Sequence, residues 1–391
     1  MTAGSTTLLR AVEGDALPAA LAEALDGGRP VAPLPPEPAE RARAVRALRL
    51  DEPADPDAAV VVLSSGSTGE PKGVVLSAAA LRAGAEATHV RLGGVGHWLL
   101  PLPRHHVAGL MVLARAHLSG SAVVPLSGDL AELPDLALPS GRRYLSLVPT
   151  QLVRALALPR LVEALASLDA VLVGGAATDP ALLARARVAG VPCVTTYGMS
   201  ETCGGCVYDG VPLDGVDVAV GLPDRVGGVD GDRISVGGPV VFSGYRGRPD
   251  LTADALRSGR FLTSDRGAWV TGTDGVARLA VLGRVDDVVV SGGHNVDLSA
   301  VEARAHAWPE RGTAEIAVVG VPDPEWGTEV VAVTDDHDLT LAGLRSWVRA
   351  ELPAYAAPRR LVALDRLPRT GGDKVDRRRL RAELAPTKEN R

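Results

Sequence analysis

Short apolar runs alternate with helical stretches between residues 58 and 200. The runs expected as strands are AAVVVL, HWLLPLP, SAVVPL, RRYLSLV, DAVLVGG and PCVTTYG, and the helices are expected near 77–88, 106–119 and 180–189. Such alternation is typical of a mainly parallel sheet that is covered by helices. We therefore predict an α/β fold for this part of the chain.

The segments on either side show different patterns of expected helices and strands. Before residue 58, the sequence predicts a helix at 17–25, a proline-rich link and a helical stretch at 40–48. Between 205 and 282 glycine and proline become dense, and the runs RISVGG, VVFSGY and VARLAVLG predict a small β subdomain. After 283, the expected strands are VDDVVV, AEIAVVGV, EVVAVT and RRLVAL, with helices at 298–307 and 340–352.

These changes of pattern divide the chain. We predict a large N-terminal domain at 1–282, a boundary at 283–287, and a small α+β C-terminal domain at 288–391.

The composition excludes several classes of protein. The net charge of −6 argues against a nucleic-acid partner, which usually requires a basic face. No apolar stretch approaches the roughly 20 residues needed to cross a bilayer, and acidic residues come too early for a signal peptide. Three cysteines are too few for a disulfide framework. We therefore expect a cytoplasmic protein.

The sequence SSGSTGEPKG occupies residues 64–73, directly after an apolar run. Its glycines and hydroxyl side chains can present successive donors to an anion, and Lys72 can add a point charge. Gly73 follows Lys72 where a Walker A motif has Ser or Thr, so this is a different phosphate loop. On this segment alone, a flexible surface loop is the alternative.

Five further segments follow along the chain: GGAA at 174–177, YGMSET at 197–202, FLTSDRG at 261–267, LGRVDDVVVSGGHNV at 282–296, and LPRTGGDKVDRRRL at 367–380. Together with the 64–73 loop, and in the same order along the chain, they resemble the motifs of the adenylate-forming superfamily. This superfamily includes acyl-CoA synthetases, peptide-synthetase adenylation domains and luciferases. The resemblance implies an α/β enzyme with a small mobile C-terminal domain that activates a carboxylic acid with ATP.

The resemblance also implies which residues hold ATP. The phosphate loop would be Ser64, Ser65, Gly66, Ser67, Thr68, Gly69 and Lys72, and the adenine would lie against Gly174, Gly175, Ala176, Tyr197 and Gly198. Ser200 would donate to the α-phosphate, Asp265 would bind the ribose hydroxyls, and Arg284 would lie near the ribose or phosphates. Glu201 would be the Mg²⁺ ligand, since carboxylate oxygen suits a hard cation.

Lys374 matches the family's catalytic lysine, which bridges the acid and the α-phosphate. Asp373 stands where the family usually has Gly, and its carboxylate could tether this lysine. His106 aligns with a family histidine at the acyl pocket, although a histidine beside an apolar helix can also be structural.

The wall of the acyl pocket is expected at Cys203, Gly204 and Gly205. Cys203 and Cys206 form a CxxC motif, which can also indicate redox chemistry or half a zinc site. We favour the pocket wall because the sequence offers no second ligand pair.

Members of this superfamily form an acyl-adenylate first and then rotate the C-terminal domain for attack by a thiol. Asp286 matches the hinge residue, so the resemblance implies that the boundary at 283–287 is the hinge of this rotation. The hairpin Ser291, Gly292, Gly293 and His294 would then line the tunnel for coenzyme A (CoA), while Lys374 moves away. The expected small molecules are thus ATP, Mg²⁺, CoA and a carboxylic acid.

The runs YGMSETCGGCVYDGVPLDGV, PLPRHHVAGL and GGVGHWLL are similar to the compact o-succinylbenzoate–CoA ligases of menaquinone biosynthesis. Those enzymes have a shortened N-terminal region, and here too the phosphate loop is expected as early as residue 64, much earlier than in most of the superfamily. The substrate implied is an aromatic dicarboxylate, with Arg104 and Thr150 as candidate partners of its ring carboxylate. Two alternatives stay open: another aryl or acyl ligase, which could load a carrier protein, and a nucleotide-binding regulatory module without catalysis. Homodimers are common in this family.

Overall fold

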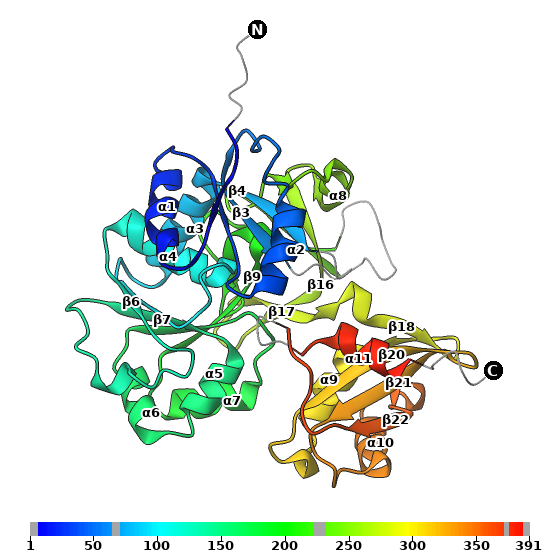
Figure 1. Ribbon diagram of the computed structural model, residues 1–391. Helices are drawn as coiled ribbons and strands as arrows, with labels where there is room; N and C mark the ends of the chain where they lie inside the picture. Colours follow the sequence, from blue (N-terminus) through cyan, green and yellow to red (C-terminus); the bar gives the residue numbers. More distant parts are fainter. Residues whose placement is uncertain (1–6, 65–70, 222–231, 371–374, 386–391) are drawn as a thin grey trace. The chain divides into compact units, whose positions relative to one another are not determined.

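The computed structural model describes residues 7–64, 71–221, 232–370 and 375–385 (Figure 1). The chain divides into two compact units. The larger contains Met1–Ala219, Ser235–Thr263 and Trp269–Leu279, and the smaller contains Val220–Ile234, Ser264–Ala268 and Ala280–Arg391. The fold is mixed α/β, as predicted.

The first sheet of the larger unit has the order β1 (Arg10–Val12), β2 (Val31–Pro33), β3 (Ala58–Ser64), β4 (Lys72–Ser77) and β14 (Gly244–Tyr245). The run AAVVVL forms β3, as predicted. The structure departs from the prediction at β4, which pairs antiparallel with β3 in a sheet separate from the other predicted runs. A connection this short cannot cross over to a parallel neighbour, so β3 and β4 form a hairpin.

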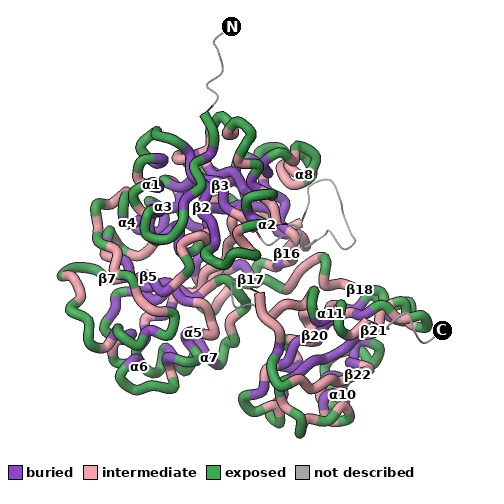
Figure 2. Tube along the Cα trace, in the orientation of Figure 1, coloured by how far each residue is buried: buried purple, intermediate pink, exposed green. Residues whose placement is uncertain are grey.

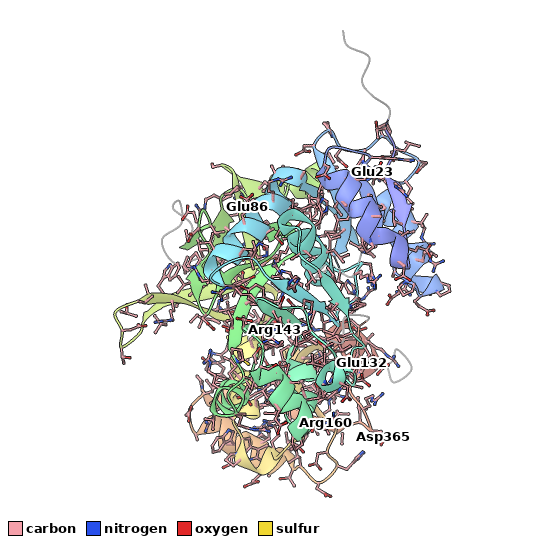
Figure 3. The ribbon with its side chains drawn as sticks, turned by 90° about the vertical axis from the view of Figure 1, so that its left-hand side faces the viewer. Glu23, Glu86, Glu132, Arg143, Arg160 and Asp365 are labelled. Carbon is pink, nitrogen blue, oxygen red and sulfur yellow. The ribbon has the colours of Figure 1, made fainter. Side chains whose placement is uncertain are left out.

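The second sheet has the order β11 (Val211–Pro212), β10 (Gly204–Tyr208), β9 (Cys193–Met199), β8 (Ala170–Val173), β7 (Arg143–Leu147), β5 (His97–Leu100) and β6 (Val123–Pro125). The five strands from β9 to β6 are parallel, which confirms the prediction for this segment. Figure 3 labels Arg143, the residue at which β7 begins.

Helices separate and cover these two sheets (Figure 1). Residues of α1 (Leu17–Leu25), α3 (Ala78–Arg91) and α4 (Val107–Ser119) share one core with both sheets. The opposite face of the first sheet packs on α2 (Pro38–Leu48), and that of the second sheet packs on α5 (Pro149–Ala155), α6 (Pro159–Ala166) and α7 (Pro180–Val188). Both faces are therefore covered, and the strands are mostly buried (Figure 2). The sequence did not predict α5 and α6.

A third sheet has the order β12 (Asp217–Val220), β13 (Arg233–Gly237), β16 (Arg260–Thr271) and β15 (Leu256–Arg257), and β17 (Ala277–Arg284) pairs with β16. This is the predicted β-rich region, with one correction. The run VVFSGY supplies only the two residues of β14, which join the first sheet next to the short helix α8 (Pro249–Ala255).

The smaller unit contains β18 (Val288–Ser291), β19 (His294–Asp297), β20 (Ile316–Asp323), β21 (Gly327–Thr334) and β22 (Arg360–Ala363), in the sheet order β19-β18-β21-β20 with β22 beside β21. Its helices are α9 (Leu298–His306), α10 (Leu341–Arg349) and α11 (Arg377–Leu384). In VDDVVV the strand begins only at Val288, because Val285–Asp287 form a 3₁₀ turn, η4. Among the described residues, no helix has the length and apolarity needed to cross a membrane.

Candidate active site

The YGMSET segment ends β9 and turns into a 3₁₀ helix, η3 (Ser200–Thr202). Thr202 fixes this turn: its hydroxyl accepts the N–H of Met199 at 3.0 Å and donates to the carbonyl of Gly204 at 2.8 Å. Cys203 then adopts a left-handed φ of 51°, which reverses the chain into β10. Ser200 and Glu201 are therefore presented by a rigid turn at the end of a parallel strand.

Glu201 is buried, with 9% of its surface exposed. The hydroxyl of Tyr245 donates a hydrogen bond of 2.9 Å to its Oε1, and the N–H of Phe242 donates to its backbone carbonyl at 2.9 Å. Burial raises the pKa of the Tyr245 phenol, and the charge of Glu201 raises it further. The phenol therefore stays protonated and acts as a donor to the carboxylate.

Lys72 opens β4, opposite Ser64 at the end of β3. Its Nζ lies 5.1 Å from the centroid of the Tyr245 ring, within the range of a cation–π contact. Lys72 and Glu201 thus both contact Tyr245, although 129 positions separate them in the sequence. The predicted phosphate-loop residues Ser65, Gly66, Ser67, Thr68 and Gly69 lie outside the described residues.

The predicted adenine contacts come from neighbouring strands. Gly174, Gly175 and Ala176 follow the carboxyl end of β8, and Tyr197 and Gly198 lie near the carboxyl end of β9. β8 and β9 pair in parallel, so these two motifs lie at the same edge of the sheet, where α/β folds commonly bind ligands.

Close packing accounts for the glycines in these motifs. A Cβ on Gly174 would lie 2.1 Å from Oγ1 of Thr196, and Gly175 has a φ of 80°. A Cβ on Gly205 would lie 3.0 Å from the Tyr208 ring. The backbone at Gly174 therefore approaches its neighbour more closely than a residue with a Cβ allows, and the contact at Gly205 would be tighter than most Cβ contacts.

His106 is the N-cap residue of α4, and its ring centroid lies 4.3 Å from that of His105. Burial lowers the pKa of His105, and the charge of Glu40 opposes this effect. A Cβ on Gly204 would contact Cγ of Met111, also on α4, at 3.5 Å. The predicted acyl-pocket residues His106 and Gly204 are thus both associated with α4.

Cys203 and Cys206 are buried, with 1% and 0% of their surface exposed. Burial raises the pKa of both thiols, that of Cys206 to about 12. Within the described part of the chain, no group of three or more His, Cys, Asp or Glu side chains could hold a metal ion. Cys203 instead belongs to the core shared by the two sheets.

Arg284, at the end of β17, joins two predicted site residues of the smaller unit. Its Nη1 lies 3.4 Å from Oδ1 of Asp265, and its Nη2 donates to Oδ2 of Asp286 at 2.8 Å. Burial lowers the pKa of Arg284, but the hydrogen bond to Asp286 and the charges of Asp265, Asp286 and Asp287 outweigh it and raise the pKa overall. Asp265, Arg284 and Asp286 therefore form one charged group.

The predicted thiol-tunnel residues form the tip of the β18–β19 hairpin. Gly292 and Gly293 have φ values of 57° and 79°, and the N–H of Gly292 donates to the carbonyl of Trp326 at 2.9 Å. The ring of His294 stacks on Tyr355 with a centroid distance of 4.2 Å and an interplanar angle of 9°. Ser291 is buried at the base of the tip.

Lys374 and Asp373 lie outside the described residues. In the described part of the same sequence segment, Arg369 donates to both carboxylate oxygens of Glu315, at 2.8 and 2.6 Å.

Arg104 and Thr150 are the candidate partners of the substrate's ring carboxylate. Arg104 is paired with Asp15 at 2.7 Å, whereas Thr150 lies in the first turn of α5.

Sequence reasoning missed Tyr245, which the structure places between Lys72 and Glu201. From the sequence, the segment VVFSGY predicts only a short strand. A tyrosine among apolar residues in a chain with only five tyrosines is a signal, because a buried Tyr hydroxyl needs a polar partner. The identity of that partner could not be read from the sequence.

Comparison with known proteins assigns the chain to a family. Residues 5–245 match the family model of the AMP-binding enzymes, and residues 301–374 match the model of the AMP-binding enzyme C-terminal domain. The chain is 46% identical over 342 residues to a probable 2-succinylbenzoate–CoA ligase from Mycobacterium tuberculosis, covering 84% of this chain and 85% of the relative. The protein therefore belongs to the AMP-binding enzyme family.

Solved structures agree with this assignment. The o-succinylbenzoate CoA synthetase of Bacillus subtilis, in complex with its acyl-adenylate intermediate, superposes with a TM-score of 0.70 at 25% identity, covering 93% of this chain and 80% of that one. The same enzyme in complex with ATP and magnesium gives a TM-score of 0.71 at 26% identity, covering 94% and 82%. The fold is thus that of the adenylate-forming enzymes, with a large N-terminal and a smaller C-terminal domain.

Proposed function

We propose that the protein is an AMP-forming acid–thiol ligase that converts 2-succinylbenzoate, ATP and CoA into the CoA thioester, AMP and pyrophosphate, as a step of menaquinone biosynthesis. The observation that carries this proposal is the 46% identity to a probable 2-succinylbenzoate–CoA ligase over 84% of the chain. The geometry supports it, because the two motifs that we assign to adenine, GGAA and YGMSET, lie at the same edge of the second sheet.

In the first step, the acid's carboxylate attacks the α-phosphate of ATP, and pyrophosphate leaves. Both reactants are negatively charged, so the site must neutralise charge and align them. We assign Lys72 to the phosphates and Ser200 to the α-phosphate. Lys374, from the C-terminal domain, is proposed to bridge the acid and the α-phosphate.

A magnesium ion suits this set of residues. Mg²⁺ is commonly bound by one or two carboxylates together with substrate phosphates, and Glu201 offers one buried carboxylate on a fixed turn. We propose that Glu201 holds the ion, which would supply charge neutralisation at the phosphates. The related enzyme of B. subtilis was solved in complex with ATP and a magnesium ion, which supports magnesium as the metal.

In the second step, the CoA thiol attacks the acyl-adenylate and releases AMP. We propose that Asp286 lies in a hinge at 283–287 between an N-terminal domain of 1–282 and a C-terminal domain of 288–391. The hairpin of Ser291 and His294 would then guide the thiol. We place the reaction in the cytoplasm, where ATP and CoA are available.

The choice of acid is the finer part of the proposal. We assign Gly204 and Gly205 to the wall of the proposed acyl pocket. A Cβ on either residue would meet Met111 or Tyr208, so the absence of a side chain here serves close packing and does not by itself select the acid. We propose that His106 is the catalytic residue that contacts the acid in this pocket. Other aryl or acyl acids are the alternative, and they would use the same residues for ATP.

The test is pyrophosphate release with ATP and Mg²⁺ and a panel of acids, each with and without CoA. The panel contains 2-succinylbenzoate, benzoate, a medium-chain fatty acid and acetate. We expect turnover only with 2-succinylbenzoate, a CoA thioester as product, and loss of adenylation in Lys374→Ala. Turnover of another acid would keep the ligase and discard the substrate. ATP binding without pyrophosphate release from any acid would contradict the proposal as a whole.

A further inference from the structure

We propose that Tyr245 is a positioning residue for adenylation: its hydroxyl orients the carboxylate of Glu201, and its ring holds the ammonium group of Lys72. This inference rests on the proposed function, in which Glu201 and Lys72 bind the metal and the phosphates of ATP. The hydrogen bond is 2.9 Å long, and the ammonium lies 5.1 Å from the ring centroid.

Tyr245 is itself held firmly in place. As part of β14 it pairs with Val74 of β4, and its N–H donates to Oγ1 of Thr252 at 2.9 Å. Its ring contacts Phe242 edge to face at 4.9 Å, and Phe242 in turn contacts Phe261 at 5.3 Å. These are the only two phenylalanines in the sequence, so a rare rigid aromatic cluster supports this position.

The strand pairing explains why one ring reaches both charged groups. β14 lies next to β4, which begins at Lys72, and η3 packs against β3 and β4. The N–H of Phe242 also donates to the carbonyl of Glu201, so the segment that carries Tyr245 is tied to the turn that carries the carboxylate. Tyr245 thereby couples the start of β4 to η3.

The chemical value of a tyrosine here is that it is neutral. An arginine in its place would fix Glu201 by an ion pair and cancel the charge that a cation needs. A hydroxyl donor removes the rotational freedom of the carboxylate and leaves its charge in place. Likewise, a cation–π contact restrains Lys72 without an anion, so the full positive charge stays available for phosphate. One side chain thus orients two opposite charges and neutralises neither.

Two substitutions separate the two contacts. Tyr245→Phe removes the hydroxyl and keeps the ring, whereas Tyr245→Leu removes both. The readout is the affinity for a fluorescent ATP analogue, titrated with Mg²⁺ in the absence of any acid, together with the Mg²⁺ dependence of pyrophosphate release. We expect Tyr245→Phe to raise the Mg²⁺ concentration at half-saturation about tenfold, because a hydrogen bond to a charged group is lost. Nucleotide affinity without metal should be unchanged.

Tyr245→Leu should show the same change in Mg²⁺ dependence and also bind the nucleotide about threefold to tenfold more weakly without metal. A double-mutant cycle with Glu201→Gln tests the route: Tyr245→Phe should have no further effect on the Mg²⁺ dependence once the carboxylate is gone. Tyr144→Phe is the matched control, since Tyr144 is a buried tyrosine whose hydroxyl donates to the carbonyls of Leu92 and Gly94. It should lower stability and leave the Mg²⁺ dependence as in the wild type.

A Tyr245→Phe variant that is less stable but has the wild-type Mg²⁺ dependence would overturn the inference, because a structural role alone predicts that result. An effect of equal size in the Glu201→Gln background would also overturn it. If the wild type itself shows no Mg²⁺-dependent nucleotide binding, the proposed function fails, and that result is seen without any variant. Tyr245→Phe alone suffices for the decision if Tyr245→Leu does not fold.

Discussion

The backbones of Gly198 and Gly204 lie so close that a Cβ on Gly198 would be 2.0 Å from the carbonyl oxygen of Gly204. These residues belong to the paired strands β9 and β10, on either side of the turn that presents Glu201. We predict that Gly198→Ala destabilises the protein by about 3 kcal/mol or more, because the backbone must move to admit the methyl group. Thermal or urea unfolding measures this loss.

Gly128→Ala is the control for the Gly198 substitution. The atom nearest to a Cβ added at Gly128 would be 3.9 Å away, which is ordinary van der Waals contact. This variant should unfold like the wild type. Equal effects of the two substitutions would show that the narrow gap between β9 and β10 can relax.

A second prediction concerns Arg246, which is 4% exposed. Its guanidinium donates to Asp55 at 2.8 Å and to four backbone carbonyls between residues 48 and 53, so it fastens the segment before β3. Arg246→Met should cost about 3–5 kcal/mol, because it strands these acceptors and one carboxylate. Arg246→Lys should recover only part of this stability, since it lacks the planar fork.

Arg160→Met is the comparison for Arg246. Arg160 lies on α6 (Figure 3), and its ion pair with Asp135 is largely exposed on both sides. Exposed pairs contribute little to stability. A loss for Arg160→Met as large as that for Arg246→Met would mean that burial does not decide the difference.

The third prediction is a pH dependence of stability. Burial, with the nearby charge of Arg115, lowers the pKa of His89 from 6.5 to about 4. The unfolded chain therefore binds a proton at His89 below pH 6.5, whereas the folded protein does not until about pH 4. The contribution of His89 to the free energy of unfolding is fully present above pH 6.5. It falls by roughly 3 kcal/mol as the pH drops to 4.

His89→Gln tests the pH prediction, because glutamine does not titrate and can still accept the hydrogen bond that Trp98 Nε1 donates to His89 at 3.3 Å. Its unfolding free energy should depend less steeply on pH between 6.5 and 4 than that of the wild type. Parallel wild-type and His89→Gln curves would refute the assignment.

Local patterns predicted much of this fold. The parallel strands β5 to β9 were readable because each is a short apolar run followed by a turn or helix. The antiparallel pairing of β3 with β4 was not, because it depends on the short connection rather than on the runs themselves. The contact of Tyr245 with Lys72 and Glu201 joins three distant segments, which meet because β14 pairs with β4 and η3 packs against β3 and β4. The polar helix α11 also lacked an apolar pattern, and its start is marked by the N-cap residue Asp376, whose carboxylate accepts a hydrogen bond from the N–H of Arg379.

A fourth prediction addresses nucleotide binding through Asp265. Its carboxylate is proposed to accept from two ribose hydroxyls, and an amide offers only one acceptor oxygen without charge. Asp265→Asn should therefore raise KM for ATP about tenfold or more and leave KM for the acid unchanged. Asp274→Asn, in an exposed turn, is the control. Equal changes in both KM values would instead indicate a general disturbance of the fold.

The last prediction concerns the three cysteines. Cys193, Cys203 and Cys206 are all buried, and burial raises the pKa of each thiol. Because the thiolate is the reactive form, the native protein should react with a thiol reagent at none of them within the time in which an exposed thiol reacts fully. After denaturation, all three should react. Rapid modification of Cys203 or Cys206 in the native state, or a loss of activity on incubation with a zinc chelator in excess Mg²⁺, would instead favour redox or metal chemistry at the CxxC motif.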